Sequence, residues 1–71
     1  MNTSLSKFVV EYWQRPGGWE WAVRLRTRHT WILRGAVRET ERQVRNDINK
    51  MIDDLFRPGT CIVQRVTYLV Q

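Results

Sequence analysis

Apolar and polar residues alternate without interruption in the segment WEWAVRLR, residues 19–26, which is the pattern of a β-strand with one buried face. The preceding segment, residues 7–14, is rich in aromatic and β-branched residues, which favour strands. Between the two segments, Pro16 and Gly17 suit the central positions of a type II turn. The pattern therefore predicts an antiparallel hairpin with strands at 7–14 and 19–26.

A loop at residues 15–18 sets the register of this hairpin, because position 14 then pairs with position 19. The same register brings three apolar pairs to one face of the sheet: Phe8 with Leu25, Val10 with Val23, and Tyr12 with Trp21. A shift of one residue would send these side chains to opposite faces. The register is therefore predicted by the side chains as well as by the turn.

A third strand is expected over residues 30–35, after a short loop with the sequence TRH. Pairing position 26 with position 30 would place residues 31 and 33 opposite residues 25 and 23 on the buried face. We therefore expect Trp19, Trp21 and Trp31 in the core. Parity places Trp13 on the opposite, open face, where it is either an exposed stacking ring or lies beneath the fourth strand or a dimer partner.

Residues 41–56 have the apolar spacing of an amphipathic α-helix. Thr40 suits the N-cap, and Gln43 follows three residues later, as in a capping box. Pro58 and Gly59 are expected to end the helix. The apolar stripe consists of Val44, Ile48, Met51, Ile52, Leu55 and Phe56.

The C-terminal segment, residues 61–70, is a fourth strand by composition. Both of its faces are partly apolar, which is typical of a strand that is covered on two sides or lies at a subunit seam. Beside the first strand it would give the order 3-2-1-4, with a parallel pairing reached through a right-handed crossover. The alternative is that it pairs with a second chain in a homodimer.

The expected fold is therefore α+β, with the elements in the order βββαβ. An antiparallel three-stranded meander packs on one amphipathic helix, and the fourth strand closes the sheet or pairs in a dimer. A chain of 71 residues is expected to form a single small domain, residues 1–71.

Positive charge is concentrated in the middle of the chain. The sequence has 12 Lys and Arg against 7 Asp and Glu, with a net charge of +5. Ten of the cations are arginine, and seven of these lie between residues 24 and 45 beside only two acids. Arginine binds phosphate and carboxylate through a planar fork, which favours recognition of an anionic surface. The alternative explanation for the high arginine content is a GC-rich genome, which favours arginine codons over lysine codons without any functional cause.

The predicted strands turn the arginines onto the open face of the sheet. There Arg24, Arg26 and Arg34 would be neighbours that repel one another unless an anion or an acidic partner relieves the repulsion. Lys7 and Trp13 lie at the margin of this face, and three more arginines precede or lie on the helix. The candidate binding residues are Arg24, Arg26, Arg28, Arg34, Lys7, Trp13, His29, Arg38, Arg42 and Arg45.

Two kinds of partner fit such a surface. In a nucleic-acid-binding protein, the sheet would lie against a DNA or RNA phosphate backbone or in a groove, with arginines contacting phosphates. In an inhibitor or adaptor of the kind made by phages and mobile elements, anti-CRISPR proteins included, the arginines would bind an acidic protein surface. Trp13 or Ile32 would then be an anchor. A purely structural or oligomeric role is the third alternative.

The stretch VRLRTRHTWILRG, residues 23–35, adds a likeness of layout. Three antiparallel strands followed by one helix, with arginine and tryptophan on the sheet, resemble the small DNA-binding domains of the AP2 type and the arm-binding domains of some tyrosine integrases. The likeness covers roughly residues 8–56, matches no diagnostic motif and leaves the fourth strand as an addition. It implies a DNA-binding sheet at the level of the fold.

The residue inventory disfavours an enzyme. His29 is the only histidine and Cys61 the only cysteine, and a pair of the two would lack a third, orienting group. Asp53 and Asp54 are adjacent on the predicted helix, about 100° apart, and do not converge on one point. We expect no catalytic residues, no metal site and no cofactor.

The sequence also bears on the location of the protein. It has no apolar signal segment and no apolar run long enough to span a membrane. A single cysteine excludes an internal disulfide and fits a reducing compartment. We therefore expect a cytoplasmic protein, complete from its Met1, that does not act at a membrane.

Overall fold

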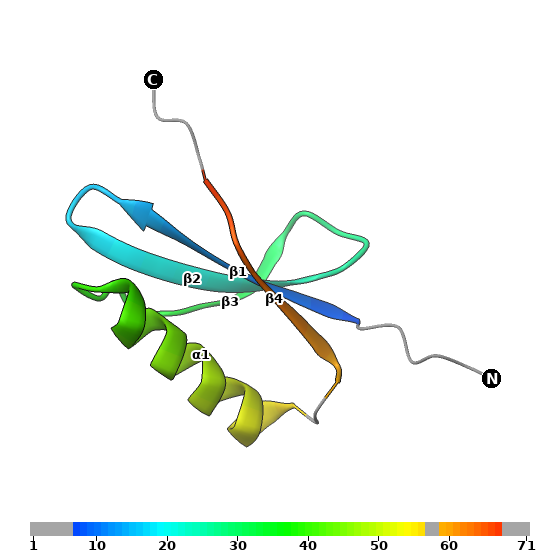
Figure 1. Cartoon of the computed structure of the whole chain (residues 1–71). Helices are drawn as coiled ribbons and strands as arrows, with labels where there is room; N and C mark the ends of the chain where they lie inside the picture. The colour runs from blue at the N-terminus through cyan, green and yellow to red at the C-terminus, as the bar shows by residue number, and fades with distance from the viewer. Residues whose placement is uncertain (1–6, 57–58, 68–71) are drawn as a thin grey trace.

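The structure, a computed structural model, describes residues 7–56 and 59–67 of the chain. Its elements follow one another as β1 (Phe8–Arg15), β2 (Gly18–Leu25), β3 (Trp31–Arg34), α1 (Glu41–Leu55) and β4 (Cys61–Arg65). The four strands form one mixed sheet, and α1 lies along one face of it (Figure 1). The expected α+β class is confirmed.

The strand order in the sheet is β3-β2-β1-β4. The first three strands pair antiparallel, whereas β4 returns to lie parallel to β1. This order is compatible with the arrangement in which the fourth strand adds to the sheet beside the first. The strand ends at Arg65, earlier than expected, and the last part of the predicted strand, residues 68–70, lies outside the described residues.

The predicted register of the first hairpin is confirmed. Phe8 pairs with Leu25, Val10 with Val23, and Tyr12 with Trp21. The strands extend one residue further than expected, so that only residues 16 and 17 form the turn. Gly17 has a φ of 90°, the positive value that the third position of a type II turn requires.

The predicted register of the second hairpin is wrong by one residue beyond Val23. Val23 pairs with Leu33 as expected, but Arg24 pairs with Trp31, and a β-bulge separates the two pairs. A tight three-residue loop needs a residue with positive φ, and the described residues show this conformation at glycines only. The loop at 26–30 contains no glycine, so it widens, and the bulge carries Trp31 to the open face instead of the core.

The core lies between the sheet and α1. Thr40 caps the helix as predicted, because its hydroxyl accepts from the Gln43 amide and the Gln43 side chain accepts from the Thr40 amide at 3.0 Å. Phe56 packs on Phe8 with ring centroids 4.8 Å apart and so ties the end of α1 to the start of β1. The buried residues of this core between the sheet and the helix are Val10, Tyr12, Trp19, Trp21, Val23, Val44, Ile48 and Met51.

The sequence places Leu33 on the buried face of the sheet, under the helix. The helix packs mainly against β1 and β2, however, and covers β3 incompletely. Leu33 remains exposed at the edge of the sheet. At this edge, Gly35 lies directly against the indole ring of Trp21, and a Cβ at position 35 would overlap the ring atoms. The amide of Gly35 also donates to the carbonyl oxygen of Trp21 at 2.9 Å. This close approach closes the core beside β3.

Replacing Gly35 by alanine is expected to lower the free energy of unfolding by about 1–3 kcal/mol, because the added methyl group must displace the Trp21 ring or the backbone. Chemical denaturation followed by tryptophan fluorescence measures the change. Ala36→Gly is the control, since Ala36 is exposed and should change stability by less than about 1 kcal/mol. Equal stability of Gly35→Ala and the wild type would contradict this packing.

Candidate functional site

The open face, which is the face of the sheet away from α1, carries two buried carboxylates. Glu11 on β1 and Glu20 on β2 are each only 8% exposed. The two oxygens of Glu11 accept from Arg24 Nε at 3.3 Å and from Gln64 Nε2 at 2.9 Å. Glu11 therefore has a hydrogen-bond partner on each of the two neighbouring strands, as a buried charge requires.

Glu20 is paired in the same way. Arg15 Nη1 lies 3.5 Å from one of its oxygens, and Arg34 Nη2 lies 3.4 Å from the other. The open face is thus a network of opposite charges, and the expected cluster of mutually repelling arginines is not present on it. Sequence parity placed Arg24 and Arg34 correctly on one face, but it did not show that the glutamates between them neutralise this face.

The two arginines differ in how much they expose. The side chain of Arg24 is 17% exposed, whereas that of Arg34 is 57% exposed. Arg24 is therefore a structural residue, and Arg34 keeps part of its guanidinium group accessible while paired to Glu20. Only Arg34 of this pair remains a candidate for contact with a partner.

Trp13 and Trp31 cover the middle of the open face. Their rings stack with centroids 5.6 Å apart at an interplanar angle of 25°. The completely buried Ala22 lies on β2 between the strands that carry the two rings, and its small side chain leaves room for them to meet. Trp13 is therefore buried, so the expectation of an exposed ring is wrong, and the described residues show Trp31 as its stacking partner. The end of the predicted fourth strand, residues 68–70, lies outside the described residues.

Arg24 also shapes the loop between β2 and β3. Its Nη1 donates to the carbonyl oxygens of Leu25 at 3.3 Å, Arg26 at 3.2 Å and Arg28 at 3.2 Å. Three carbonyl groups of the loop thus turn toward one guanidinium group, which Glu11 holds from the other side. Because the carbonyl groups of the loop point toward Arg24, the side chains of residues 26–30 point away from it and are exposed to solvent.

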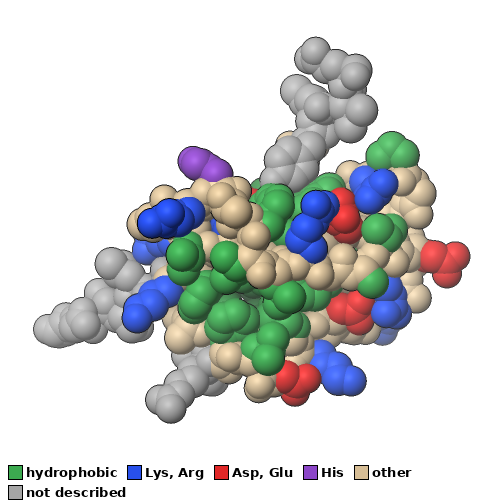
Figure 2. All heavy atoms as spheres, turned by 180° about the vertical axis from the view of Figure 1, so that it is seen from behind, with side chains coloured by type: hydrophobic (Ala, Val, Ile, Leu, Met, Phe, Trp, Pro, Cys, Tyr) green, Lys and Arg blue, Asp and Glu red, His purple; other side chains and the backbone are tan. Residues whose placement is uncertain are grey.

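Three of these outward residues and the neighbouring Lys7, which precedes β1, form what we call the basic loop: Lys7, Arg26, Arg28 and His29. All four are exposed, and the amide of Arg26 joins the loop to the carbonyl oxygen of Lys7 at 2.9 Å. Within residues 7–56 and 59–67, their side chains make no ion pair. The loop projects from the sheet at the end away from the β1–β2 turn (Figure 1), and the histidine stands out from the surface beside basic side chains (Figure 2).

The remaining candidate arginines lie elsewhere. Arg38 forms an ion pair with Asp47 at 3.2 Å, and its backbone bonds to Trp19 near the start of β2. Arg42 and Arg45 are exposed on α1, where they line a shallow groove of about 330 Å³ with Asn46 and Asn49. The structure does not bring these three arginines together with the basic loop.

The described residues contain no group of three His, Cys, Asp or Glu side chains that could hold a metal ion. Cys61 packs at the edge of the core, and burial raises the pKa of its thiol, against a smaller lowering by the Thr60 hydroxyl. The thiol is therefore protonated near neutral pH and is a poor nucleophile. Within the described part of the chain, no helix has the length and apolar composition needed to cross a membrane.

Comparison with known proteins gave no match to a family model, to a curated protein or to a solved structure. The likeness of residues 8–56 to AP2-type and integrase arm-binding domains therefore rests on the layout of strands and helix alone. The site has to be interpreted from its own geometry.

Replacing Arg24 by glutamine is expected to lower the free energy of unfolding by about 2–3 kcal/mol, because it leaves Glu11 buried with one donor and releases three loop carbonyls. Arg38→Gln is the matched control, since the Arg38–Asp47 pair is more exposed and should contribute less than about 1 kcal/mol. Urea denaturation of both variants measures the difference. A loss for Arg24→Gln no larger than for Arg38→Gln would contradict the structural role of Arg24.

Proposed function

We propose that this protein binds nucleic acid through the basic loop and the adjoining Arg34, with the loop acting as a preformed phosphate-binding element. The observation that supports this most directly is the contrast between neutralised and unneutralised cations. Arg15, Arg24, Arg34 and Arg38 are paired with the protein's own acids, whereas the side chains of Lys7, Arg26 and Arg28 have no acidic partner among the described residues.

The arrangement of the loop lowers the cost of binding. Arg24 already fixes the loop carbonyls, so the backbone does not have to be ordered when the exposed side chains meet an anion. Unpaired cations at one end of a sheet also attract a polyanion at long range. Release of counterions from the nucleic acid then supplies most of the affinity.

The contacts are expected to go to phosphates more than to bases. The two indole rings of the open face are stacked on each other, and Trp13 is buried, so this face offers no free platform for an unpaired base. Arginines in a loop reach the phosphates of a duplex without such a platform. We therefore propose double-stranded nucleic acid, with little sequence preference, as the ligand.

Binding to a short random duplex should weaken with salt in proportion to the number of phosphates contacted. The three unpaired cations of the basic loop, Lys7, Arg26 and Arg28, predict a slope of log K against log salt near −2.7, at about −0.9 for each phosphate. Fluorescence anisotropy of a labelled duplex over a range of salt concentrations measures this slope. A matched single strand is expected to bind more weakly.

The double variant Arg26→Gln/Arg28→Gln should reduce the slope by about 1.8 and weaken binding strongly at low salt. Its control, Arg42→Gln/Arg45→Gln, removes the same charge from exposed positions on α1 and should leave most of the binding intact. Equal losses in the two double variants would show that net charge, and not the basic loop, is responsible. No binding by the wild type at micromolar concentration would exclude nucleic acid as the ligand.

A protein partner is the second candidate, because the structure also exposes apolar surface. A groove of about 390 Å³ beside β3 and α1 is lined by Trp21, Ala36, Met51 and Leu55, together with charged residues. Figure 2 shows hydrophobic side chains gathered over the middle of one side of the molecule, with basic and acidic side chains around them. An inhibitor or adaptor would use such a patch, and its binding would depend much less on salt.

A further inference from the structure

The outer edge of β4 is open within the described residues. Its inner edge bonds to β1, as shown by the bonds from Phe8 N to Thr60 O at 3.1 Å and from Val66 N to Tyr12 O at 2.9 Å. In a parallel pair, residues that bond to the neighbour alternate with residues that point away from it. The backbone groups of Cys61, Val63 and Arg65 therefore point to the outside of the sheet.

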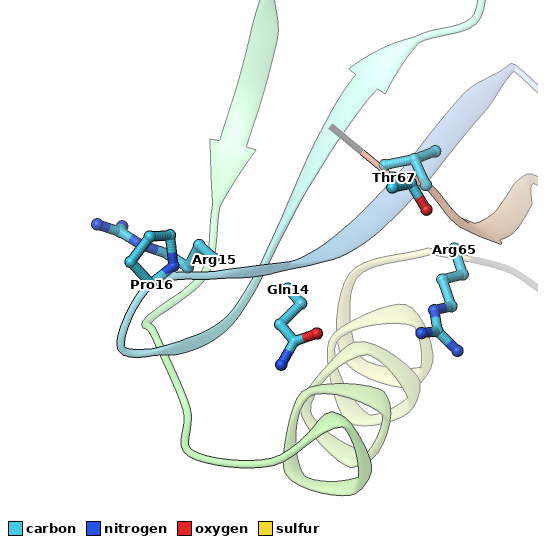
Figure 3. Close-up of a pocket in the computed structure, with 6 residues that line it drawn as sticks. Gln14, Arg15, Pro16, Arg65 and Thr67 are labelled. Carbon is cyan, nitrogen blue, oxygen red and sulfur yellow. The ribbon is translucent and has the colours of Figure 1, made fainter. Parts of the chain in front are cut away.

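Both polar side chains near the end of this strand are turned away from the edge. The Gln64 amide donates to Glu11 at 2.9 Å. The Arg65 guanidinium lies 5.2 Å from the centre of the Trp19 ring and 3.7 Å from Glu41 on α1. Figure 3 shows Arg65 directed toward the helix. Ile62 and Val63 are the exposed apolar side chains of the strand, one on each face.

The other edge of the sheet is protected in the ways that native proteins use. β3 has four residues, a β-bulge separates two of its pairs with β2, and the chain after it bends back to bond with Trp19 through Arg38. Short length and bulges discourage pairing with another strand. β4 has no proline or bulge, and its one charged side chain, Arg65, is directed toward α1, so the two edges differ in features that control strand pairing.

We propose that the outer edge of β4 pairs antiparallel with β4 of a second copy of this chain, about a two-fold axis at Val63. This register joins the outward residues of the two strands as hydrogen-bonded pairs, with Val63 opposite its own copy and Cys61 opposite Arg65. Ile62 then lies opposite Gln64 on the other face. The two sheets become one continuous sheet of eight strands.

The one charge on this edge, Arg65, distinguishes between registers of a homodimer. A two-fold axis at Arg65 would bring two guanidinium groups face to face, which is unfavourable. An axis at Val63 brings the exposed valines together at the centre and places each arginine opposite a neutral cysteine, four positions from the other arginine. In this register no like charges lie opposite each other, so the edge can pair with its own copy about a two-fold axis.

The dimer is expected to depend on protein concentration. Stable interfaces bury about 1,200–2,000 Å², and five residues of edge pairing bury less than this. Sedimentation velocity of the full chain from micromolar to millimolar concentration should show a monomer that converts reversibly to a dimer. A wild-type protein that stays monomeric throughout this range would overturn the proposal, whatever the variants do.

Val63→Lys places two ammonium groups opposite each other on the axis and should raise the dissociation constant of the dimer at least about tenfold. Val37→Lys is the matched control, because Val37 is 45% exposed, close to the 43% of Val63, but lies between β3 and α1. This control should dimerise as the wild type does. An equal effect of both variants would overturn the proposed interface.

Mixing the two chains Val63→Lys and Val63→Asp tests the axis itself. If residue 63 faces its own copy, the mixture should form a heterodimer at concentrations where each variant alone is monomeric. No association in the mixture would overturn this register, and tryptophan emission and circular dichroism establish that each variant is folded. Because dimerisation is measured without nucleic acid, its outcome is independent of the proposed ligand.

Discussion

The ion pair between Glu11 and Arg24 joins the middle of the sheet to the β2–β3 loop. Glu11 is buried and needs a hydrogen-bond donor, which Arg24 supplies through its Nε atom. The Nη1 atom of the same guanidinium group donates to three carbonyl oxygens of the loop. Gln64 supplies the second donor from β4. One carboxylate is therefore linked to β2, to β4 and to the conformation of the loop.

The same constraint separates two uses of arginine that the sequence presents as one. Arginines next to Glu11 and Glu20 belong to the structure of the open face, since a buried carboxylate without a partner would be costly. Arg26 and Arg28, in the β2–β3 loop, have no such partner among the described residues. The proposed phosphate contacts therefore come from the loop and from the accessible part of Arg34, and the flat surface of the sheet contributes little.

Much of the fold follows from local pattern. The alternation of the first hairpin, the turn at Pro16 and Gly17, and the capping residues Thr40 and Gln43 are each set by a few neighbouring residues, and all agree with the structure. The apolar stripe of α1 agrees in part, because its members Val44, Ile48 and Met51 are buried whereas Leu55 is 64% exposed. The position of Trp31 could not be derived in this way, because parity counted along the strand fails at a bulge. One signal was available: the loop at 26–30 has no glycine to form a tight turn.

The candidate site was predicted less completely than the fold. Parity places Arg24, Arg34 and Trp13 on one face, but the pairing of each with Glu11, Glu20 or Trp31 depends on contacts between strands. The strand pattern also places Glu11 and Glu20 on this face. In the register of the hairpin, Glu20 pairs with Trp13 and Glu11 pairs with Ala22, so neither acid lies directly opposite an arginine. Their diagonal contacts with arginines are not fixed by a one-dimensional pattern.

The bulge beside Arg24 has a consequence for how this protein can vary among related sequences. The extra residue of the bulge is Ile32, between Trp31 and Leu33, so the face on which Trp31 lies is determined on β3 itself and not by the loop before it. The identities of residues 26–30 face no comparable restriction, because their side chains point outward. Selection should therefore preserve the bulge on β3 more strictly than the composition of residues 26–30, which would let homologues change what they bind without altering the fold.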